Sequence, residues 1–366
     1  MRRTVSMRLG LMVAALALVA AACTGDDDDG NGDEAAQGQQ GGQAGSLLNQ
    51  VRDRGTLRCG VNDAAPGLGF LTPEGDIEGF DIDFCRAIAA AVLGDPDAVE
   101  LVVTTTEERF NALRAGEFDV LTRNTTWTSS RDGAEGIAFA HVNLYDGQGM
   151  MVRSDSGFGG VEDMDGTTVC VLAGTTTELN LADYFQSLGI GNTPLTFEEN
   201  TQIQEAFIAG QCQGWSSDRS QLVGLRSAFP EQQGGPDALE ILPDVMSKEP
   251  LAPAVVDGDS AWLDVVNWVV NGLILAEELE VTGQNVSDQA SSPDDPQIAA
   301  MLGVPFEGGE APDHGLGVDN DFMQDVLTAV GNYGEIYDRH LTPLELDRGL
   351  NELWTNGGIQ YATPFR

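Results

Sequence analysis

The folded part of the chain alternates short apolar runs with longer segments of helical periodicity. Residues 56–61 (TLRCGV) and 99–105 (VELVVTT) are short and rich in β-branched residues, which indicates strands. Residues 81–94 (DIDFCRAIAAAVLG) repeat apolar side chains every three to four positions, which indicates a helix. A second helical segment ends near Gly116, and a strand follows at 118–121. This β-α-β-α-β order predicts a parallel sheet with helices on both faces.

The same order recurs downstream. The predicted elements are a strand at 166–174, a helix at 175–189, a strand at 194–199, a helix at 201–212 and a strand edge at Asp218. Two similar α/β units therefore stand in series, joined near residues 149–155.

The last third of the chain becomes helical. A long helix is predicted at 262–279, with further helical segments as far as Trp354. This tail is too long for a linker, so we expect it to pack back onto the first unit and the chain to cross twice between two lobes. We divide the folded part into a first lobe (47–150), a second lobe (151–252) and a return to the first lobe with a helical tail (253–366).

The N-terminus has the pattern of an export signal. Three arginines precede an apolar run from Leu9 to Ala22 that is too short to span a bilayer, and Cys23 follows Ala-Ala-Ala. The expected cleavage site before Cys23 resembles that of a bacterial lipoprotein. The alternative is a plain secretory signal followed by an incidental cysteine. We expect residues 1–22 to be a lipoprotein signal peptide, and lipidated Cys23 to anchor the protein to the outer face of the cell membrane. Residues 23–46, acidic and rich in glycine, are expected to form a flexible tether.

The formal net charge of the 366-residue chain is −40. Such a charge repels nucleic acid and anionic lipid, which argues against both as partners. Its simplest interpretation is a strongly solvated acidic surface. An acidic ligand would then need a local cation to hold it.

Four cysteines remain after Cys23: Cys59, Cys85, Cys170 and Cys212. An even number in an exported chain indicates disulfides, for which three connectivities are possible. The two local pairings, Cys59–Cys85 and Cys170–Cys212, would each lie within one lobe. No two of these cysteines have the spacing of metal ligands and the three histidines are scattered, so we expect neither a metal nor a cofactor.

Five segments resemble the bacterial extracellular solute-binding proteins of the polar amino-acid ABC transporter family, and most closely its general L-amino-acid branch. They are 79–95, 108–132, 139–153, 169–185 and a C-terminal pair at 329–341 and 353–366. The resemblance covers about residues 47–366 and implies the two-lobed α/β periplasmic-binding-protein (Venus flytrap) fold. Each lobe would be a mostly parallel sheet flanked by helices, and two strands would form the hinge. The implied function is to bind a free L-amino acid between the lobes, as a monomer, and to deliver it to an ABC permease.

A free amino acid is a zwitterion, so its site needs a cation for the carboxylate and an anion for the ammonium. The resemblance places these at Arg131 and Asp218, and a guanidinium fork suits a carboxylate. By residue type alone, Arg131 could equally be a surface residue paired with Asp132 or Glu135. Asp218 could instead pair with Arg219 or cap the helix that follows.

The resemblance implies further ligand contacts. Asn124 and Thr126 would bind the ligand backbone, while Thr175 and Thr176 would assist the carboxylate at a helix N-terminus that Thr175 and Glu178 cap. The wall around the ligand side chain would come from the loop 66–70, where Phe70 is the nearest aromatic residue, and from the turn 104–106 with Thr106. Arg123 stands where narrower relatives have Ser, and could either favour acidic side chains or face outward toward Glu117.

Two other functions use this fold: a dehydratase-like enzyme and an amino-acid-sensing receptor. An enzyme of this kind needs a buried carboxyl acid that faces the ligand. Only Glu178 is placed by a motif, and its capping role already explains it. A receptor needs a membrane-spanning segment, and no stretch after the leader reaches that length. We therefore expect a binding protein rather than an enzyme.

Overall fold

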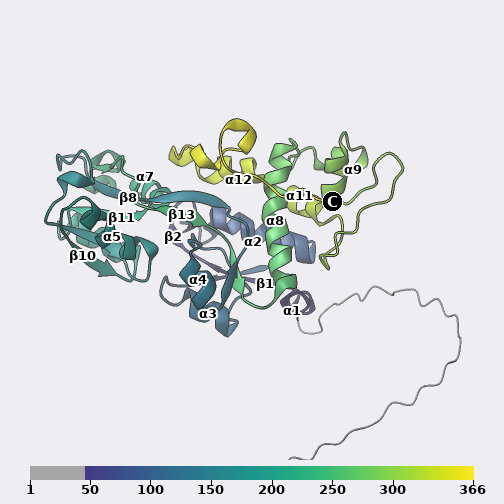
Figure 1. Ribbon diagram of the computed structural model, residues 1–366, viewed down its shortest axis with the longest axis horizontal. Coiled ribbons are helices and arrows are strands. Elements are labelled where there is room, and N and C mark those ends of the chain that lie inside the picture. The colour runs from purple at the N-terminus through teal and green to yellow at the C-terminus, as the bar shows by residue number, and fades with distance from the viewer. Residues whose placement is uncertain (1–45) are drawn as a thin grey trace, which may run out of the picture. The chain divides into compact units, whose positions relative to one another are not determined.

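The computed structural model describes residues 46–366 (Figure 1). The expected signal peptide, Cys23 and the tether up to residue 45 lie outside the described residues. Within residues 46–366, no helix is both long and apolar enough to cross a membrane.

The first sheet is mostly parallel, as the sequence predicts. Its spatial order is β5 (Val99–Val103), β1 (Leu57–Val61), β6 (Val120–Leu121), β14 (Ala254–Val256) and β7 (Ile137–Phe139). The first three strands are mutually parallel because the helices α2 (Phe80–Leu93) and α3 (Arg109–Ala115) connect them. Strand β14, which arrives from late in the chain, runs antiparallel to both of its neighbours.

The second sheet repeats this arrangement. Its order is β10 (Asn192–Phe197), β9 (Thr167–Leu172), β11 (Gly214–Asp218), β8 (Leu144–Arg153) and β12 (Leu239–Ile241). Helices α5 (Thr176–Ser187) and α6 (Asn200–Ile208) connect its three parallel strands, and β8 runs antiparallel to both neighbours. In each sheet, therefore, the fourth position is held by an antiparallel strand that lies outside the β-α-β-α-β unit: β14 follows its unit late in the chain, and β8 precedes its unit.

Two antiparallel strands join the sheets. The first half of β8 pairs with β13 (Lys248–Leu251), from Gly147↔Lys248 to Leu144↔Leu251. From Gln148 onward, β8 pairs with β11 of the second sheet. Figure 1 shows β8 and β13 running between the two sheets, which places a double connection beside the site described below.

The helical tail packs on the first sheet's helices. It comprises α8 (Ser260–Glu278), α9 (Val286–Ser291), α10 (Pro296–Met301), α11 (Phe322–Val330) and α12 (Tyr333–His340). Buried apolar residues of β1, α2, α8, α11 and α12 form one continuous cluster. Asp83 of α2 also pairs with Arg339 and with His340, whose Nε2 lies 2.7 Å from a carboxylate oxygen. The tail is thus bound to the first sheet by both apolar and ionic contacts.

The remaining α-helices and strands are short. They are α1 (Leu47–Arg54), β2 (Ala64–Ala65), β3 (Gly69–Leu71), β4 (Ile77–Glu78), α4 (Ser129–Ala134) and α7 (Arg219–Ser227). Strands β2, β3 and β4 form a small antiparallel sheet in the glycine-rich loop.

Both disulfides have the predicted local pairing. Cys59–Cys85 joins β1 to α2, and Cys170–Cys212 joins β9 to the turn before β11. Each disulfide therefore stabilises the packing around one sheet.

Candidate functional site

One cavity gathers residues from both sheets. Its lining includes seven of the eight predicted ligand-binding residues: Thr106, Asn124, Thr126, Arg131, Thr175, Thr176 and Asp218. They follow the carboxyl ends of β5, β6 and β9 or end β11, which is where open α/β sheets bind their ligands.

Phe70, the eighth predicted residue, does not line this cavity. It lies on β3, and its side chain is 37% exposed. Gly69 is the only buried residue of β3, and Leu71 is exposed as well, so the large side chains of this strand face solvent. Trp127 also lies outside the lining, stacked on Phe139 at a centroid distance of 5.8 Å. Neither of these two aromatic side chains therefore lines the cavity.

Arg131 is a buried residue that lines the cavity. Its side chain lies on α4 and the residue is 8% exposed. The Nη1 group donates to Thr126 O at 2.9 Å, and the guanidinium lies 5.3 Å from the centroid of the Phe110 ring. Burial lowers the pKa of Arg131, while nearby carboxylates oppose that shift. The surface alternative does not hold, because Glu135 pairs with Arg114 instead.

Asp218 ends β11 and is 6% exposed. Asn124 Nδ2 donates to its carboxylate at 3.2 Å. Burial, with repulsion from Asp146 and Glu249, raises the pKa of Asp218 well above its ordinary value. Asp218 makes no side-chain cap to α7, and Arg219 donates to backbone carbonyls instead. A cation placed beside this carboxyl group would oppose the rise in its pKa.

The N-terminus of α5 is capped much as predicted. Thr175 Oγ1 accepts from Glu178 N at 3.0 Å, while Glu178 accepts from Gly174 N at 2.9 Å rather than from Thr175 N. The Thr175 hydroxyl donates to Leu172 O at 2.7 Å. Its proton is therefore committed to the backbone, and the first turn of α5 offers an anion mainly its N–H groups and dipole.

Arg123 faces inward rather than toward Glu117. It is buried, lines the cavity, and donates from Nε to Thr104 O at 2.8 Å. Burial lowers the pKa of Arg123 to about 10, against the opposing effect of Glu199 and Asp81. Of the two possibilities left open by the sequence, the outward orientation does not hold, and the preference for acidic side chains stays a prediction.

Arg109 is a cavity residue that sequence reasoning missed. It is 3% exposed, its guanidinium lies 4.9 Å from the Phe110 centroid, and its Nε has no hydrogen-bond partner among the described residues. Burial and the proximity of Arg131 and Arg123 lower the pKa of Arg109. One feature of the sequence could have identified Arg109. It lies three and four residues before Ala112 and Leu113, on the face of α3 that is buried, where an apolar residue is the norm.

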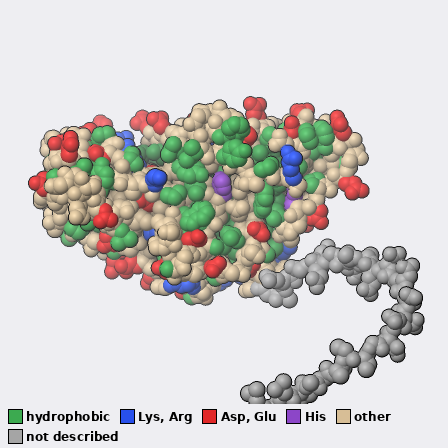
Figure 2. Space-filling view, in the orientation of Figure 1, with side chains coloured by type: hydrophobic (Ala, Val, Ile, Leu, Met, Phe, Trp, Pro, Cys, Tyr) green, Lys and Arg blue, Asp and Glu red, His purple; other side chains and the backbone are tan. Residues whose placement is uncertain are grey.

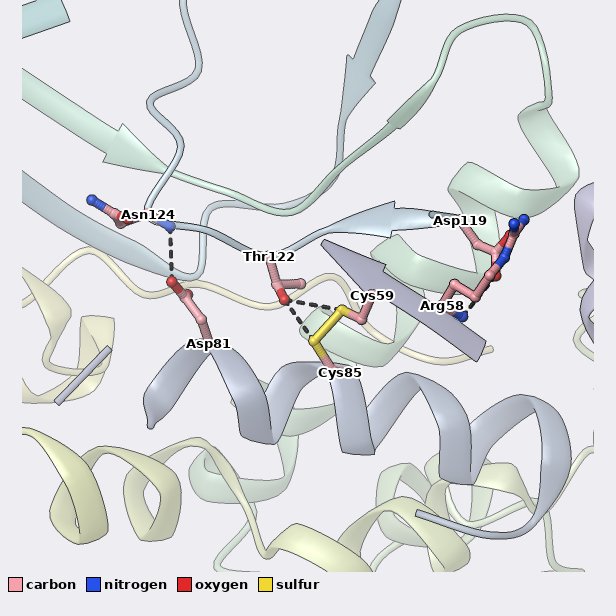
Figure 3. Close-up of a disulfide and its surroundings, with 7 residues drawn as sticks. All are labelled: Arg58, Cys59, Asp81, Cys85, Asp119, Thr122 and Asn124. Atoms are coloured by element: carbon pink, nitrogen blue, oxygen red, sulfur yellow. Dashed lines mark hydrogen bonds and ion pairs between the residues drawn. A yellow bond between two sulfur atoms is a disulfide. The ribbon is translucent and has the colours of Figure 1, made fainter. Parts of the chain in front are cut away.

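The segment carrying Asn124 and Thr126 is anchored from below (Figure 3). Asp81 accepts from Asn124 N at 2.8 Å, and Thr122 Oγ1 lies 2.8 Å from Cys85 Sγ and 3.2 Å from Cys59 Sγ. Burial raises the pKa of Asp81 to about 6. The first disulfide and a buried carboxyl group thus support the floor of the site.

The charge of the cavity differs from that of the surface. Acidic side chains are scattered over the face shown in Figure 2, whereas three arginines line the cavity. None of the three, Arg109, Arg123 or Arg131, forms an ion pair within residues 46–366. The cavity can therefore supply cations to an anionic group.

Comparisons with known proteins agree with this geometry. The chain is 44% identical over 324 residues to the general L-amino acid-binding periplasmic protein AapJ of Rhizobium johnstonii, covering 88% of this chain and 93% of that protein. It is 43% identical over 332 residues to the glutamate/glutamine/aspartate/asparagine-binding protein BztA of Rhodobacter capsulatus, covering 89% and 95%. An ABC transporter periplasmic binding protein from Brucella ovis, solved with glutathione bound, superposes with a TM-score of 0.83 at 42% identity, covering 88% of this chain and 100% of that one. Residues 57–283 match the sequence profile of the bacterial extracellular solute-binding proteins, family 3, and the chain belongs to that family.

Proposed function

We propose that this protein is the substrate-binding component of an amino-acid ABC importer and holds a free L-amino acid in the cavity described above. The observation that carries the proposal is a buried guanidinium and a buried carboxylate on one cavity, Arg131 from the first lobe and Asp218 from the second. A zwitterion complements both charges, and burial makes the pairing stronger than it would be in water.

The other two arginines bear on the ligand side chain. Arg109 and Arg123 add cationic donors to the same cavity, which favours side chains with a carboxylate or an amide oxygen. The four amino acids in the name of BztA fit this preference. The ligand range proposed here is therefore centred on acidic and amide amino acids.

Closure of the lobes has a physical cause in this arrangement. Only the closed form lets Arg131 and Asp218 contact the same ligand, so the ligand shifts the population toward closure. The closed form would then be recognised by a membrane permease. Attachment through lipidated Cys23 and a monomeric state complete the proposal, which involves no catalysis.

Calorimetric titration of Arg131→Gln tests the proposal. We expect affinity for every amino acid that the wild type binds to fall by about 100-fold, because the ligand carboxylate is left unpaired in a buried site. The matched control is Arg114→Gln, which removes an exposed guanidinium that pairs with Glu135. Wild-type affinity in Arg131→Gln would contradict the proposed site.

A further inference from the structure

Glu249 lies behind the cavity, on one of the two strands that connect the sheets. It belongs to β13 and is 1% exposed. Thr126 forms an antiparallel bridge with Leu251, and Glu249 stands two residues before Leu251 on the same face of that strand. This register brings the Glu249 carboxylate next to the Thr126 side chain.

Four donors surround the Glu249 carboxylate. Its Oε2 accepts from Thr126 Oγ1 at 2.6 Å and from Thr176 Oγ1 at 2.7 Å. Its Oε1 accepts from Asn180 Nδ2 at 3.2 Å and from the Ser247 hydroxyl. No arginine, lysine or histidine of the described chain pairs with it. The direct contacts of this buried carboxylate are therefore hydrogen bonds, while the Arg131 guanidinium acts on it from a longer distance.

The orientation of two cavity hydroxyls follows from this. A threonine hydroxyl has one proton, and a carboxylate can only accept. The Thr126 and Thr176 oxygens lie 3.3 Å apart, farther than either lies from Glu249, so each hydroxyl proton goes to the charged acceptor. Toward the cavity, both oxygens then present lone pairs only.

We propose that Glu249 is a positioning residue that makes Thr126 and Thr176 acceptors for the ligand's ammonium group. The proposal rests on the proposed amino-acid function. Thr126 follows β6 of the first sheet and Thr176 begins α5 of the second, so the same carboxylate also links the lobes in the closed form. Any contribution of Thr176 to the ligand carboxylate then comes from its backbone N–H rather than from its hydroxyl.

The test compares ligands with and without an ammonium group. The probes are L-glutamate and L-alanine, each paired with its α-hydroxy analogue, L-2-hydroxyglutarate and L-lactate. In Glu249→Gln, the amide NH₂ can only donate, which returns a threonine proton to the cavity. We expect amino-acid affinity to fall about tenfold or more, and affinity for the hydroxy acids to fall less, because a hydroxyl can donate or accept.

A double-mutant cycle separates positioning from a purely structural role. In a Thr126→Val/Thr176→Val background, the added Glu249→Gln change should cause no further loss of affinity. Thr126→Val alone should also reduce the affinity for the amino acids more than the affinity for the hydroxy acids. This measurement does not require the Glu249 variant to fold.

Two results would overturn the role of Glu249 and leave the proposed function in place. One is that Glu249→Gln lowers the affinity for amino acids and for hydroxy acids equally. The other is that it lowers amino-acid affinity as much in the Thr126→Val/Thr176→Val background as in the wild type. A wild-type protein that binds none of the twenty amino acids would overturn the proposed function and this role with it.

Discussion

Buried carboxylates around the site are held mainly by hydrogen-bond donors. Asp81 accepts from Asn124 N, Asp218 accepts from Asn124 Nδ2, and Glu249 accepts from four side chains. Dipoles compensate buried charge less completely than a paired cation does, so Asp218 would be stabilised further by a cation such as the ammonium group of the proposed ligand.

Asp81 makes stability depend on pH. Its pKa is raised from 3.8 to about 6 by burial, so the folded state holds this proton more tightly than the unfolded state. The contribution of protonated Asp81 to the free energy of unfolding is therefore fully present below pH about 4, and it is lost as the pH rises through about 6. Relative to Asp81→Asn, the free energy of unfolding of the wild type should fall by about 3 kcal/mol over that range. Urea denaturation of the ligand-free proteins at pH 4 and pH 7.5 measures this change.

Asp155→Asn provides the control, because Asp155 is exposed. The difference in free energy of unfolding between this variant and the wild type should not vary with pH. A pH-independent difference between wild type and Asp81→Asn would show that Asp81 is solvated in the folded state.

The family resemblance could place Arg131, Asn124, Thr126 and Asp218 near one another, and the structure brings all four to one cavity. Their contacts with a ligand stay a prediction. Glu249 could not be predicted, because its role depends on the bridge between Thr126 and Leu251, which are far apart in the chain.

At the scale of elements, long periodic segments were predicted well. The helix expected at 262–279 is α8, Ser260–Glu278, and the strand expected at 194–199 is β10, Asn192–Phe197. The small β2–β3–β4 sheet was missed because strands of two or three residues show no periodicity. Phe70 belongs to this small sheet, and its exposure depends on how β3 packs, which the sequence pattern does not show.

The two disulfides should differ in their effect on binding. Replacing either pair with alanine removes a loop constraint and should lower the free energy of unfolding by roughly 3–4 kcal/mol. Only Cys59–Cys85 contacts Thr122, next to the segment that carries Asn124. Calorimetry at a temperature where both variants are folded should show weaker ligand binding for Cys59→Ala/Cys85→Ala alone.

The Cys170–Cys212 variant is the matched control for that comparison, because within residues 46–366 neither sulfur of this disulfide forms a hydrogen bond like those between Thr122 and the first disulfide. Equal affinities in the two variants would show that the Thr122 contact does not support the site.

At the scale of the whole molecule, the two lobes meet at a position where only glycine fits. Gly224 lies inside α7 of the second lobe, and a Cβ there would stand 2.2 Å from Pro66 O of the first lobe. A glycine inside a helix is less stable than alanine by about 1 kcal/mol, so close approach is a sufficient physical reason for it. The close approach of α7 to Pro66 therefore requires that residue 224 have no side chain.

Gly224→Ala should affect ligand binding and folding stability in opposite directions. If the ligand-free lobes can move apart, the new methyl group is accommodated, and the helix gains up to about 1 kcal/mol of stability in urea denaturation. Closing around a ligand would press that methyl against Pro66, so calorimetry should show affinity reduced by about tenfold or more. Gly133→Ala is the matched control, since it lies in α4 and a Cβ there would meet nothing within 4 Å. Unchanged affinity in Gly224→Ala would mean that ligand binding does not require this contact between the lobes, and that closure around the ligand is looser than the geometry of α7 and Pro66 indicates.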